Sequence, residues 1–375
     1  MKKALLLAPM GSVHRRFNSA NILALKELGY EIHLVANFEN GDGPEIQNSQ
    51  YTEKCGNSGL VVHTIPFKRH SFWKNRPYVK QIAELIRDGG FSLVHAHTET
   101  GGLILRLVGR ISGVKYYYTP HGMSFYKGSS IISQLVYRPL EWWICGGMDM
   151  NIAINEDELA VLKHWNPNTA TLVHGIGLDI KRFQNVSGSR EAIRVSLEIP
   201  LNALVVLSVG ELDWNKNHTV VIDALAQLNR KDVFYLICGV GPNHNSLLEK
   251  ARNLGLEQQV KLLGYRKDIP ELLHASDDFA FPSYHEGLPV SLMEAMAAGI
   301  PAVASDIRGC VDLIENTKGG YLANPSDCQQ WVQALGFLFE SVEKRKQISC
   351  HAKSVVMSYS FDAVKQELLS LYQID

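Results

Sequence analysis

The sequence has few cysteines, no long apolar run and no excess of either charge. Its six cysteines are scattered without a C-x-x-C pair, which argues against a zinc site or a disulfide framework and favours a reducing compartment. The apolar start at residues 4–8 is too short for a signal peptide, and charged residues and a proline interrupt the run at 131–150. We therefore expect no membrane-spanning helix. A net charge of −1 with 20% charged residues predicts neither a disordered chain nor a nucleic-acid-binding one.

What the sequence does contain is an alternation of short apolar runs with helical periodicity over 375 residues, a length that suggests two domains. Nearly continuous apolar runs are typical of parallel strands covered on both faces, so the fold class is α/β with doubly wound sheets. In the first half we predict strands at residues 4–8, 31–36, 61–66, 92–96, 115–119 and 151–154.

The alternation lapses in a polar segment from Gly175 to Pro200, which we interpret as a linker. A second series follows it, with predicted strands at residues 204–209, 234–238, 260–263, 279–281 and 302–304. The last segment, 361–372, has the pattern of a terminal helix.

The most informative stretch runs from Pro282 to Pro301 and reads as a strand end, a turn and a helix. We predict Pro289 at the first helical position and Gly299 at the C-terminal cap. The free N–H groups from about Leu288 to Leu292 would then point out of the carboxyl edge of the sheet, where a phosphate is readily bound.

Two carboxylates accompany this turn. Glu286 precedes the helix and Glu294 lies inside it, eight positions on, which is slightly more than two helical turns. Both could face one ligand, with one binding sugar hydroxyls and the other a ribose diol. The competing interpretation is that Glu286 ends a loop and Glu294 is a solvated helix residue, but the strand–turn–helix context argues against it.

These residues give the sequence a resemblance to a known family. Glu286 and Glu294 match the E-x7-E signature of retaining GT-B glycosyltransferases, and the segment around them is similar to glycosyltransferase family 4. The similarity extends to Val209–His218, Gly239–Pro242, Gly264–Ile269, Tyr118–Gly128 and Val173–Phe183, and it is strongest to bacterial capsule and exopolysaccharide transferases.

The resemblance implies a GT-B fold of two Rossmann-like domains that face an interdomain cleft. Residues 1–182 would form an acceptor-binding domain, joined by a C-terminal helix at about 357–375, and residues 183–356 would bind the nucleotide sugar. It also implies roles for individual residues. The catalytic residues would be Glu286, His121 and Lys216, and the donor-binding residues Gly11, Ser12, Gly210, Tyr265, Arg266, Gly287, Leu288, Pro289, Val290 and Glu294.

One position departs from the family pattern. Many relatives carry arginine where this chain has Glu211, five residues before Lys216. A carboxylate beside a diphosphate is repulsive, whereas arginine and lysine together neutralise it. Either Glu211 turns away, or a cation such as Arg308 or Arg266 substitutes for the missing arginine.

The function implied by the resemblance is transfer of a sugar from a nucleotide-diphosphate donor, for which we expect a UDP-sugar. The acceptor would be a lipid-linked saccharide in surface polysaccharide synthesis, at the cytoplasmic face of the plasma membrane. We expect no metal or other cofactor, because Lys216 and the helix N-terminus can stabilise the leaving diphosphate. We expect retention of anomeric configuration by front-face attack, because the sequence has no second well-placed carboxylate motif. The alternatives are a sugar-nucleotide epimerase of the same architecture and a silent nucleotide-sugar-binding subunit.

Several other groups have both a functional and a structural interpretation. His121 could face the donor sugar or satisfy a turn, and His95 and His97 are expected to be structural. Residues 14–16, His-Arg-Arg, could reach acceptor or phosphate or form a solvated loop. The basic cluster Lys68, Arg69, His70, Lys74 and Arg76 could face a membrane or be ordinary surface. Gly239 and Gly241 lack the third glycine of a dinucleotide fingerprint, so dehydrogenase activity is weakly supported.

Overall fold

The computed structural model describes residues 1–39, 55–67, 72–126, 129–314 and 318–373. The chain divides into two compact units, Met1–Gly177 with Phe361–Asp375, and Leu178–Ser360. Each is built on one parallel sheet, which confirms the prediction of two doubly wound α/β domains.

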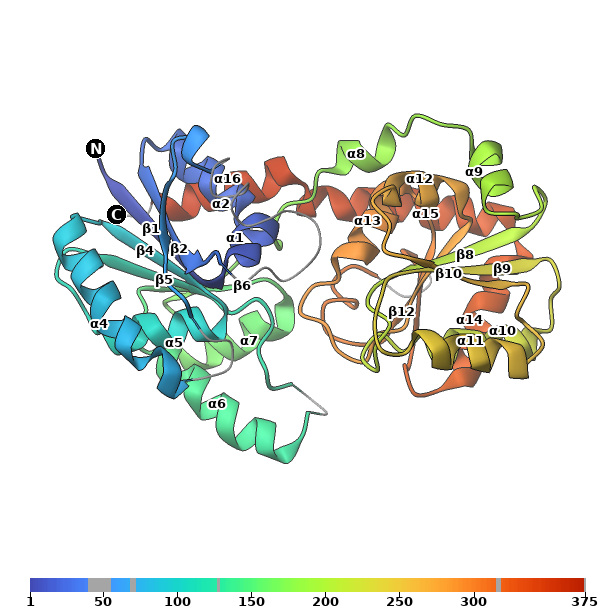
Figure 1. The fold of residues 1–375 in the computed structure, drawn as a ribbon, viewed down its shortest axis with the longest axis horizontal. Helices are drawn as coiled ribbons and strands as arrows, with labels where there is room; N and C mark the ends of the chain where they lie inside the picture. The colour runs from blue at the N-terminus through green and yellow to red at the C-terminus, as the bar shows by residue number, and fades with distance from the viewer. Residues whose placement is uncertain (40–54, 68–71, 127–128, 315–317, 374–375) are drawn as a thin grey trace. The chain divides into compact units, whose positions relative to one another are not determined.

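The first unit has a sheet of seven strands in the order β3-β2-β1-β4-β5-β6-β7 (Figure 1). The strands are β1 (Lys3–Met10), β2 (Glu31–Asn37), β3 (Val61–Thr64), β4 (Leu93–His97), β5 (Lys115–Thr119), β6 (Met150–Ala153) and β7 (Ala170–Leu172). The helices are α1 (Gly11–Phe17), α2 (Ser19–Glu27), α4 (Phe72–Gly89), α5 (Thr98–Val108), α6 (Ile131–Cys145), α7 (Glu156–Trp165) and α16 (Phe361–Tyr372).

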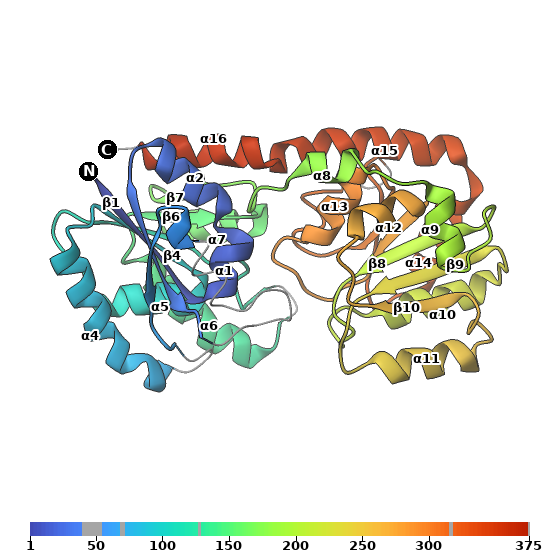
Figure 2. The same cartoon turned by 45° about the horizontal axis from the view of Figure 1, so that its top comes forward.

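The central strand β1 shows why this sheet is buried on both faces. Successive side chains of a strand point to opposite faces. Leu5 and Leu7 accordingly pack into the core formed with α4, α5, α6 and α7, while Ala4 and Leu6 pack into the core formed with α2 and α16. The terminal helix α16 lies along α2 (Figure 1, Figure 2), where the Tyr372 hydroxyl accepts a hydrogen bond from Asn21.

The second unit has six strands in the order β10-β9-β8-β11-β12-β13. They are β8 (Leu204–Val209), β9 (Val233–Cys238), β10 (Val260–Gly264), β11 (Asp278–Phe281), β12 (Ala302–Ser305) and β13 (Tyr321–Ala323). Its helices are α8 (Ile180–Gln184), α9 (Arg190–Ser196), α10 (His218–Leu228), α11 (His244–Asn253), α12 (Ile269–Ala275), α13 (Val290–Ala298), α14 (Cys328–Glu340) and α15 (Val342–Val356), with a 3₁₀ turn η1 at Met357–Tyr359.

The segment that we interpreted as a linker is part of the second unit. It forms α8 and α9, and Leu178, Ile180 and Phe183 pack into the core beneath α13. The division therefore falls after Gly177, whereas the sequence pattern suggested residue 182, because these three apolar side chains are buried with the second sheet. The sequence pattern also overlooked β7 and β13, each only three residues long.

The strand orders fix where ligands can bind. In each sheet the order reverses at the centre, between β1 and β4 in the first unit and between β8 and β11 in the second. Open α/β sheets bind ligands outside the carboxyl ends of the strands at such a reversal. The loops after these four strands are therefore the places to look for a site.

Candidate functional site

In the second unit, the loops after β8 and β11 bring two predicted residues into contact. The Nζ of Lys216 donates a hydrogen bond of 2.5 Å to a carboxylate oxygen of Glu286, across 70 positions of sequence. Both side chains are largely buried, and the ammonium group also lies 5.5 Å from the centre of the Phe281 ring. The structure thus places a cation and an anion together at the reversal point of the sheet.

Neighbouring groups pin these two loops to each other. The side-chain amide of Asn215 donates to the His285 carbonyl, and the Asn215 carbonyl accepts from the amide of Tyr284. The sequence analysis did not single out Asn215, although its position next to Lys216 was a usable signal. The Tyr284 ring also stacks on Trp214 at 4.8 Å.

Arg308, one of the two cations considered as a substitute for the missing arginine, lies beside Glu286. Its Nε donates to the Glu286 carbonyl at 3.1 Å, and an Nη nitrogen lies 3.2 Å from Nε2 of His285. Burial, together with the charges of Arg308 and Lys216, lowers the pKa of His285 to about 4. His285 is therefore neutral at pH 7, and the positive charge here comes from the other two residues.

Helix α13 begins directly after this loop. It starts at Val290, so Pro289 is the N-cap and not the first helical residue as we predicted. The Pro289 carbonyl accepts from the amides of Leu292 and Met293, which are consequently occupied. In the part of the chain that the structure describes, the amides of Leu288, Val290 and Ser291 bond to no protein group. The predicted row of bare amides is shorter than expected but present.

Two glycines allow close approach of backbone segments, one at this turn and one at the loop after β8. Gly309 has φ of +77°, and a Cβ there would lie 2.5 Å from the Gly287 carbonyl oxygen. Likewise, a Cβ on Gly239 would lie 1.8 Å from the carbonyl oxygen of Gly210. Gly239 therefore serves close packing of the loop after β8, a reason for its presence that needs no dinucleotide.

Glu294 lies within α13, partly buried, and its carboxylate has no hydrogen-bond partner among the described residues. Burial raises the pKa of Glu294 to about 7, while the charge of Arg182 acts to lower it. A desolvated carboxylate without a partner favours a ligand that brings hydroxyl donors. The partial burial of Glu294 argues against the solvated-helix interpretation.

The residues discussed for the diphosphate and the base have mixed outcomes. Glu211 is exposed, and its carboxylate forms no ion pair in the described part of the chain. Arg266 forms a two-point ion pair with Asp268, whereas Arg308 touches Glu286. Of the two proposed substitutes for the missing arginine, Arg308 is thus the one beside Glu286. Tyr265 is 42% exposed at the end of β10.

In the first unit, Gly11 and Ser12 form the start of α1, directly after β1. Gly11 is buried, and a Cβ on it would lie 2.6 Å from the Phe38 ring. His14 is also in this helix and fully buried, with its ring bonded to the Val35 carbonyl and to Asn18. Both interpretations of His14 as a solvated or ligand-reaching loop residue are therefore wrong.

His121 lies after β5 in a left-handed conformation, with φ of +59°. Its Nε2 is 2.9 Å from Nδ1 of His97, and its ring stacks on Phe17. Burial lowers the pKa of His121 to about 4, so the imidazole is neutral at pH 7. It can exchange hydrogen bonds with a ligand, but it supplies no positive charge.

His97 is the residue that positions the His121 ring. The sequence analysis expected His97 to be structural but did not connect it with His121. His97 pairs with Thr119 in register between β4 and β5, and His121 follows two residues after Thr119, just beyond the end of β5. That spacing was the signal that could have linked it to His121. The neighbouring His95 bonds to Tyr372 and Thr119, as a structural residue does.

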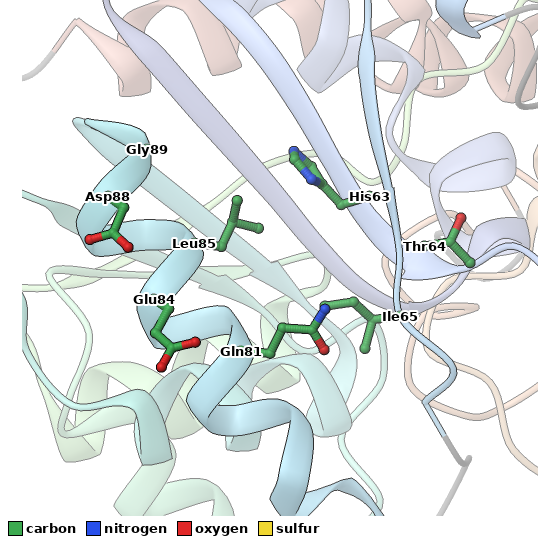
Figure 3. A pocket seen from close by; sticks show the side chains of 8 residues that line it. All are labelled: His63, Thr64, Ile65, Gln81, Glu84, Leu85, Asp88 and Gly89. Atoms are coloured by element: carbon green, nitrogen blue, oxygen red, sulfur yellow. The ribbon is translucent and has the colours of Figure 1, made fainter.

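A separate hollow lies between β3 and α4 (Figure 3). It contains none of the predicted site residues, and Glu84 and Asp88 on its helical wall disfavour a phosphate. Of the basic cluster, Lys74 and Arg76 are exposed on α4, while residues 68–70 lie outside the described residues. Within the described ranges, no group of three or more His, Cys, Asp or Glu could hold a metal, and no helix is long and apolar enough to cross a membrane.

Comparison with protein families matches both halves of the chain. Residues 22–179 match the model described as Glycosyltransferase Family 4, and residues 189–355 match that of Glycosyl transferases group 1. The two matches meet near the division between the units.

Individual relatives span much or nearly all of the chain. EpsD of Bacillus subtilis is 27% identical, covering 99% of this chain and 96% of its own. The UDP-Gal:alpha-D-GlcNAc-diphosphoundecaprenol alpha-1,3-galactosyltransferase of Escherichia coli is 28% identical, covering 71% of this chain and 70% of its own. The crystal structure of Anabaena Alr3699/HepE in complex with UDP superposes with a TM-score of 0.80 at 21% identity, over 99% of both chains, and shows the same fold. Taken with the two-sheet architecture, these matches show that the chain belongs to the family 4 type of glycosyltransferases, with the GT-B fold.

Proposed function

We propose that this glycosyltransferase moves a sugar from a UDP-sugar to a lipid-linked saccharide, with retention of anomeric configuration. The observation that supports this most directly is the contact of Lys216 with Glu286 next to the bare amides of α13. This turn brings together a cation and unpaired amides, which can bind a diphosphate, and a carboxylate, which can bind sugar hydroxyls.

The diphosphate would bind at the start of α13 and beside Lys216. Unpaired amides and the positive end of the helix dipole attract an anion, and the lysine adds a full charge. The ammonium group of Lys216 is hydrogen-bonded to Glu286, so a diphosphate would compete with this carboxylate for it. Arg308 is hydrogen-bonded to the Glu286 carbonyl. It would supply the second positive charge, which many relatives provide with an arginine at the position of Glu211.

The ribose would be bound by Glu294. Its partnerless carboxylate can accept hydrogen bonds from both hydroxyls of a diol. Because it lies in the same short helix as the bare amides, a nucleotide can contact both at once. Glu286 would then bind the sugar hydroxyls.

In the reaction, the bond between the sugar C1 and the diphosphate oxygen breaks as the acceptor hydroxyl attacks from the same face. The hydroxyl proton passes to the departing diphosphate oxygen, so the nucleotide leaves as UDP and the anomeric configuration is kept. Lys216 and the α13 amides stabilise the charge that develops on the diphosphate, and no metal is needed for that task. His121, being neutral, contributes a hydrogen bond to a sugar hydroxyl.

The printed names of relatives support the substrate classes. The Escherichia coli enzyme is named for transfer from UDP-Gal to a diphosphoundecaprenol-linked sugar in alpha-1,3 linkage, and the Anabaena protein was crystallised with UDP. An alpha product from an alpha-linked UDP-hexose is the outcome that retention predicts. We extend the proposal to surface polysaccharide synthesis at the cytoplasmic face of the membrane, in line with the lipid-linked acceptor in the name of the Escherichia coli enzyme.

The test uses the purified chain, a panel of UDP-hexoses and UDP-N-acetylhexosamines, and polyprenyl-diphosphate-linked N-acetylglucosamine as acceptor. We expect UDP release that requires acceptor, is unchanged by EDTA, and gives an alpha anomer by NMR. Glu286→Ala should abolish transfer, whereas Glu249→Ala, an exposed carboxylate on α11, should not. A beta product contradicts retention, and conversion of the donor without acceptor favours an epimerase.

A further inference from the structure

Helix α6 of the first unit has two apolar faces, although a surface helix needs only one. Its inner face packs Ile144 and Cys145 into the core against α5. Its outer face exposes six large apolar side chains, which we call the α6 apolar face: Ile131, Ile132, Leu135, Val136, Trp142 and Trp143. Figure 1 shows this helix at the periphery of its unit.

The spacing of these residues makes one continuous stripe. Ile131 and Ile132 are followed four positions later by Leu135 and Val136, and the two tryptophans come seven residues after that pair. Residues three, four and seven apart lie on the same side of a helix. Ile131, Ile132 and Leu135 are 78%, 74% and 71% exposed, so the stripe is open along its first turn and a half.

The exposed charge that α6 itself carries is positive. Glu141 is the one acidic residue of α6, but it is fully buried and accepts a hydrogen bond from Tyr118. Burial raises the pKa of Glu141 to about 8. The exposed charge of the helix is Arg138, and the guanidinium of Arg106 lies 4.9 Å from the Trp143 ring. The outer face is therefore apolar and cationic.

We propose that the α6 apolar face is the surface by which the protein binds an anionic lipid bilayer. With 15 residues the helix is too short to span one, since about 20 are needed, so it would lie in the interfacial plane. Tryptophan favours the headgroup level, and Arg138 with Arg106 complements anionic headgroups.

A second copy of the chain fits the same surface less well. Pairing through this face would bring Arg138, at the middle of the helix, toward the centre of the interface, where charged side chains are depleted. The inference rests in part on the proposed function, because a lipid-linked acceptor places the substrate in the same bilayer. Binding to lipid can nevertheless be measured without any turnover.

The experiment is co-sedimentation of the full chain with vesicles of phosphatidylethanolamine and phosphatidylglycerol, and with vesicles of phosphatidylcholine. The test variant is Ile132→Ser/Leu135→Ser/Trp142→Ser. The matched control is Val195→Ser/Leu201→Ser/Val342→Ser, which removes three exposed apolar side chains of the second unit. We expect wild type and control to bind, more tightly to the anionic vesicles, and the test variant to bind about tenfold more weakly.

Circular dichroism melts of each variant check folding, and Leu135→Glu is a single-site variant for use if the triple variant is unstable. Failure of the wild type to bind either vesicle overturns the proposal, as does equal binding by wild type and the α6 variant. A wild type that is dimeric in analytical ultracentrifugation and binds no vesicles, with a monomeric α6 variant, assigns the surface to a second copy. Because no sugar transfer is measured, these outcomes are independent of whether the proposed reaction occurs.

Discussion

The Nζ of Lys216 lies 2.5 Å from a carboxylate oxygen of Glu286, so each side chain fixes the position of the other. The contact joins the loop after β8 to the loop after β11. The contact predicts opposite effects of two substitutions on UDP affinity. Removing Lys216 deletes a group that would bind phosphate, whereas neutralising Glu286 releases the Lys216 ammonium group to bind phosphate.

We expect Lys216→Ala to weaken UDP binding and to lower kcat/KM by about 10²–10³-fold, because the charge on the leaving diphosphate loses its side-chain cation. Glu286→Gln should lower transfer comparably but bind UDP at least as tightly as wild type. Calorimetry with UDP and initial rates separate the two effects. Weaker UDP binding by Glu286→Gln would contradict the competition between Glu286 and the diphosphate.

Glu294 should make donor binding depend on pH. Its pKa of about 7 means that the carboxyl is partly protonated at neutral pH, and hydroxyl donors favour the ionised form. Affinity for UDP-glucose, whose phosphates do not titrate in this range, should therefore rise between pH 6 and pH 8. Glu294→Gln should bind more weakly at pH 8 and show a flat profile by calorimetry. A steep profile in that variant would assign the dependence to another group.

The same carboxyl also affects folding. The pKa of Glu294 in the folded protein lies above the ordinary value of 4.5, so its contribution to stability is present at low pH and is lost as the pH rises through 7. Glu294→Gln should thus be more stable than wild type at pH 8, and the two should converge near pH 4. Thermal melts at both pH values test this, and a variant less stable at pH 8 would show that the carboxylate is stabilised in the fold.

Gly309 should tolerate no side chain, because a Cβ would meet the Gly287 carbonyl at 2.5 Å and φ is +77°. Gly29 has the same φ with nothing within 4 Å, so it is a matched control. We expect Gly29→Ala to cost about 1 kcal/mol from the left-handed conformation, and Gly309→Ala about 1–3 kcal/mol more from overpacking. Chemical denaturation measures both, and equal costs would show that the turn at Gly287 can move.

His97 should act as a positioning residue for His121. The bond between their rings fixes which nitrogen of His121 carries the proton, so His97→Phe should lower kcat with little change in donor KM. His97→Asn, which can still offer a hydrogen bond, should recover part of the rate. Steady-state kinetics with matched melting curves decide the point. Loss of stability with unchanged kcat would assign His97 a purely structural role.

The buried histidines should make the fold sensitive to acid. Burial lowers the pKa of His14 to about 4 and that of His95 to about 3, below the ordinary histidine value of 6.5. The unfolded chain therefore binds protons first, and stability present above pH 6.5 is lost as pH falls toward 4. Melts from pH 7 to 4 should show this decline, and His14→Gln should make it shallower. An unchanged slope would place the acid sensitivity in other groups.

Much of the architecture was readable from the sequence. Apolar runs at residues 115–119 and 204–209 coincide with β5 and β8, and the final periodic segment coincides with α16. The prediction of a linker after Gly175 was wrong, because α8 and α9 have only short apolar faces. These faces are recognised only by their packing against α13 and α12. Strands of three residues carry too little pattern to be recognised.

The sequence alone determined the fold class and the groups at the start of α13, since hydrophobic period, glycine and proline positions and the E-x7-E spacing are local properties. Tertiary structure decided which of those groups meet. Lys216 reaches Glu286 because the reversal of strand order places β8 beside β11. Arg308 reaches the same turn, and His97 reaches His121, because β12 lies beside β11 and β5 lies beside β4. Local pattern contains no information on such long-range neighbours, nor on the burial that raises the pKa of Glu294 and lowers that of His121.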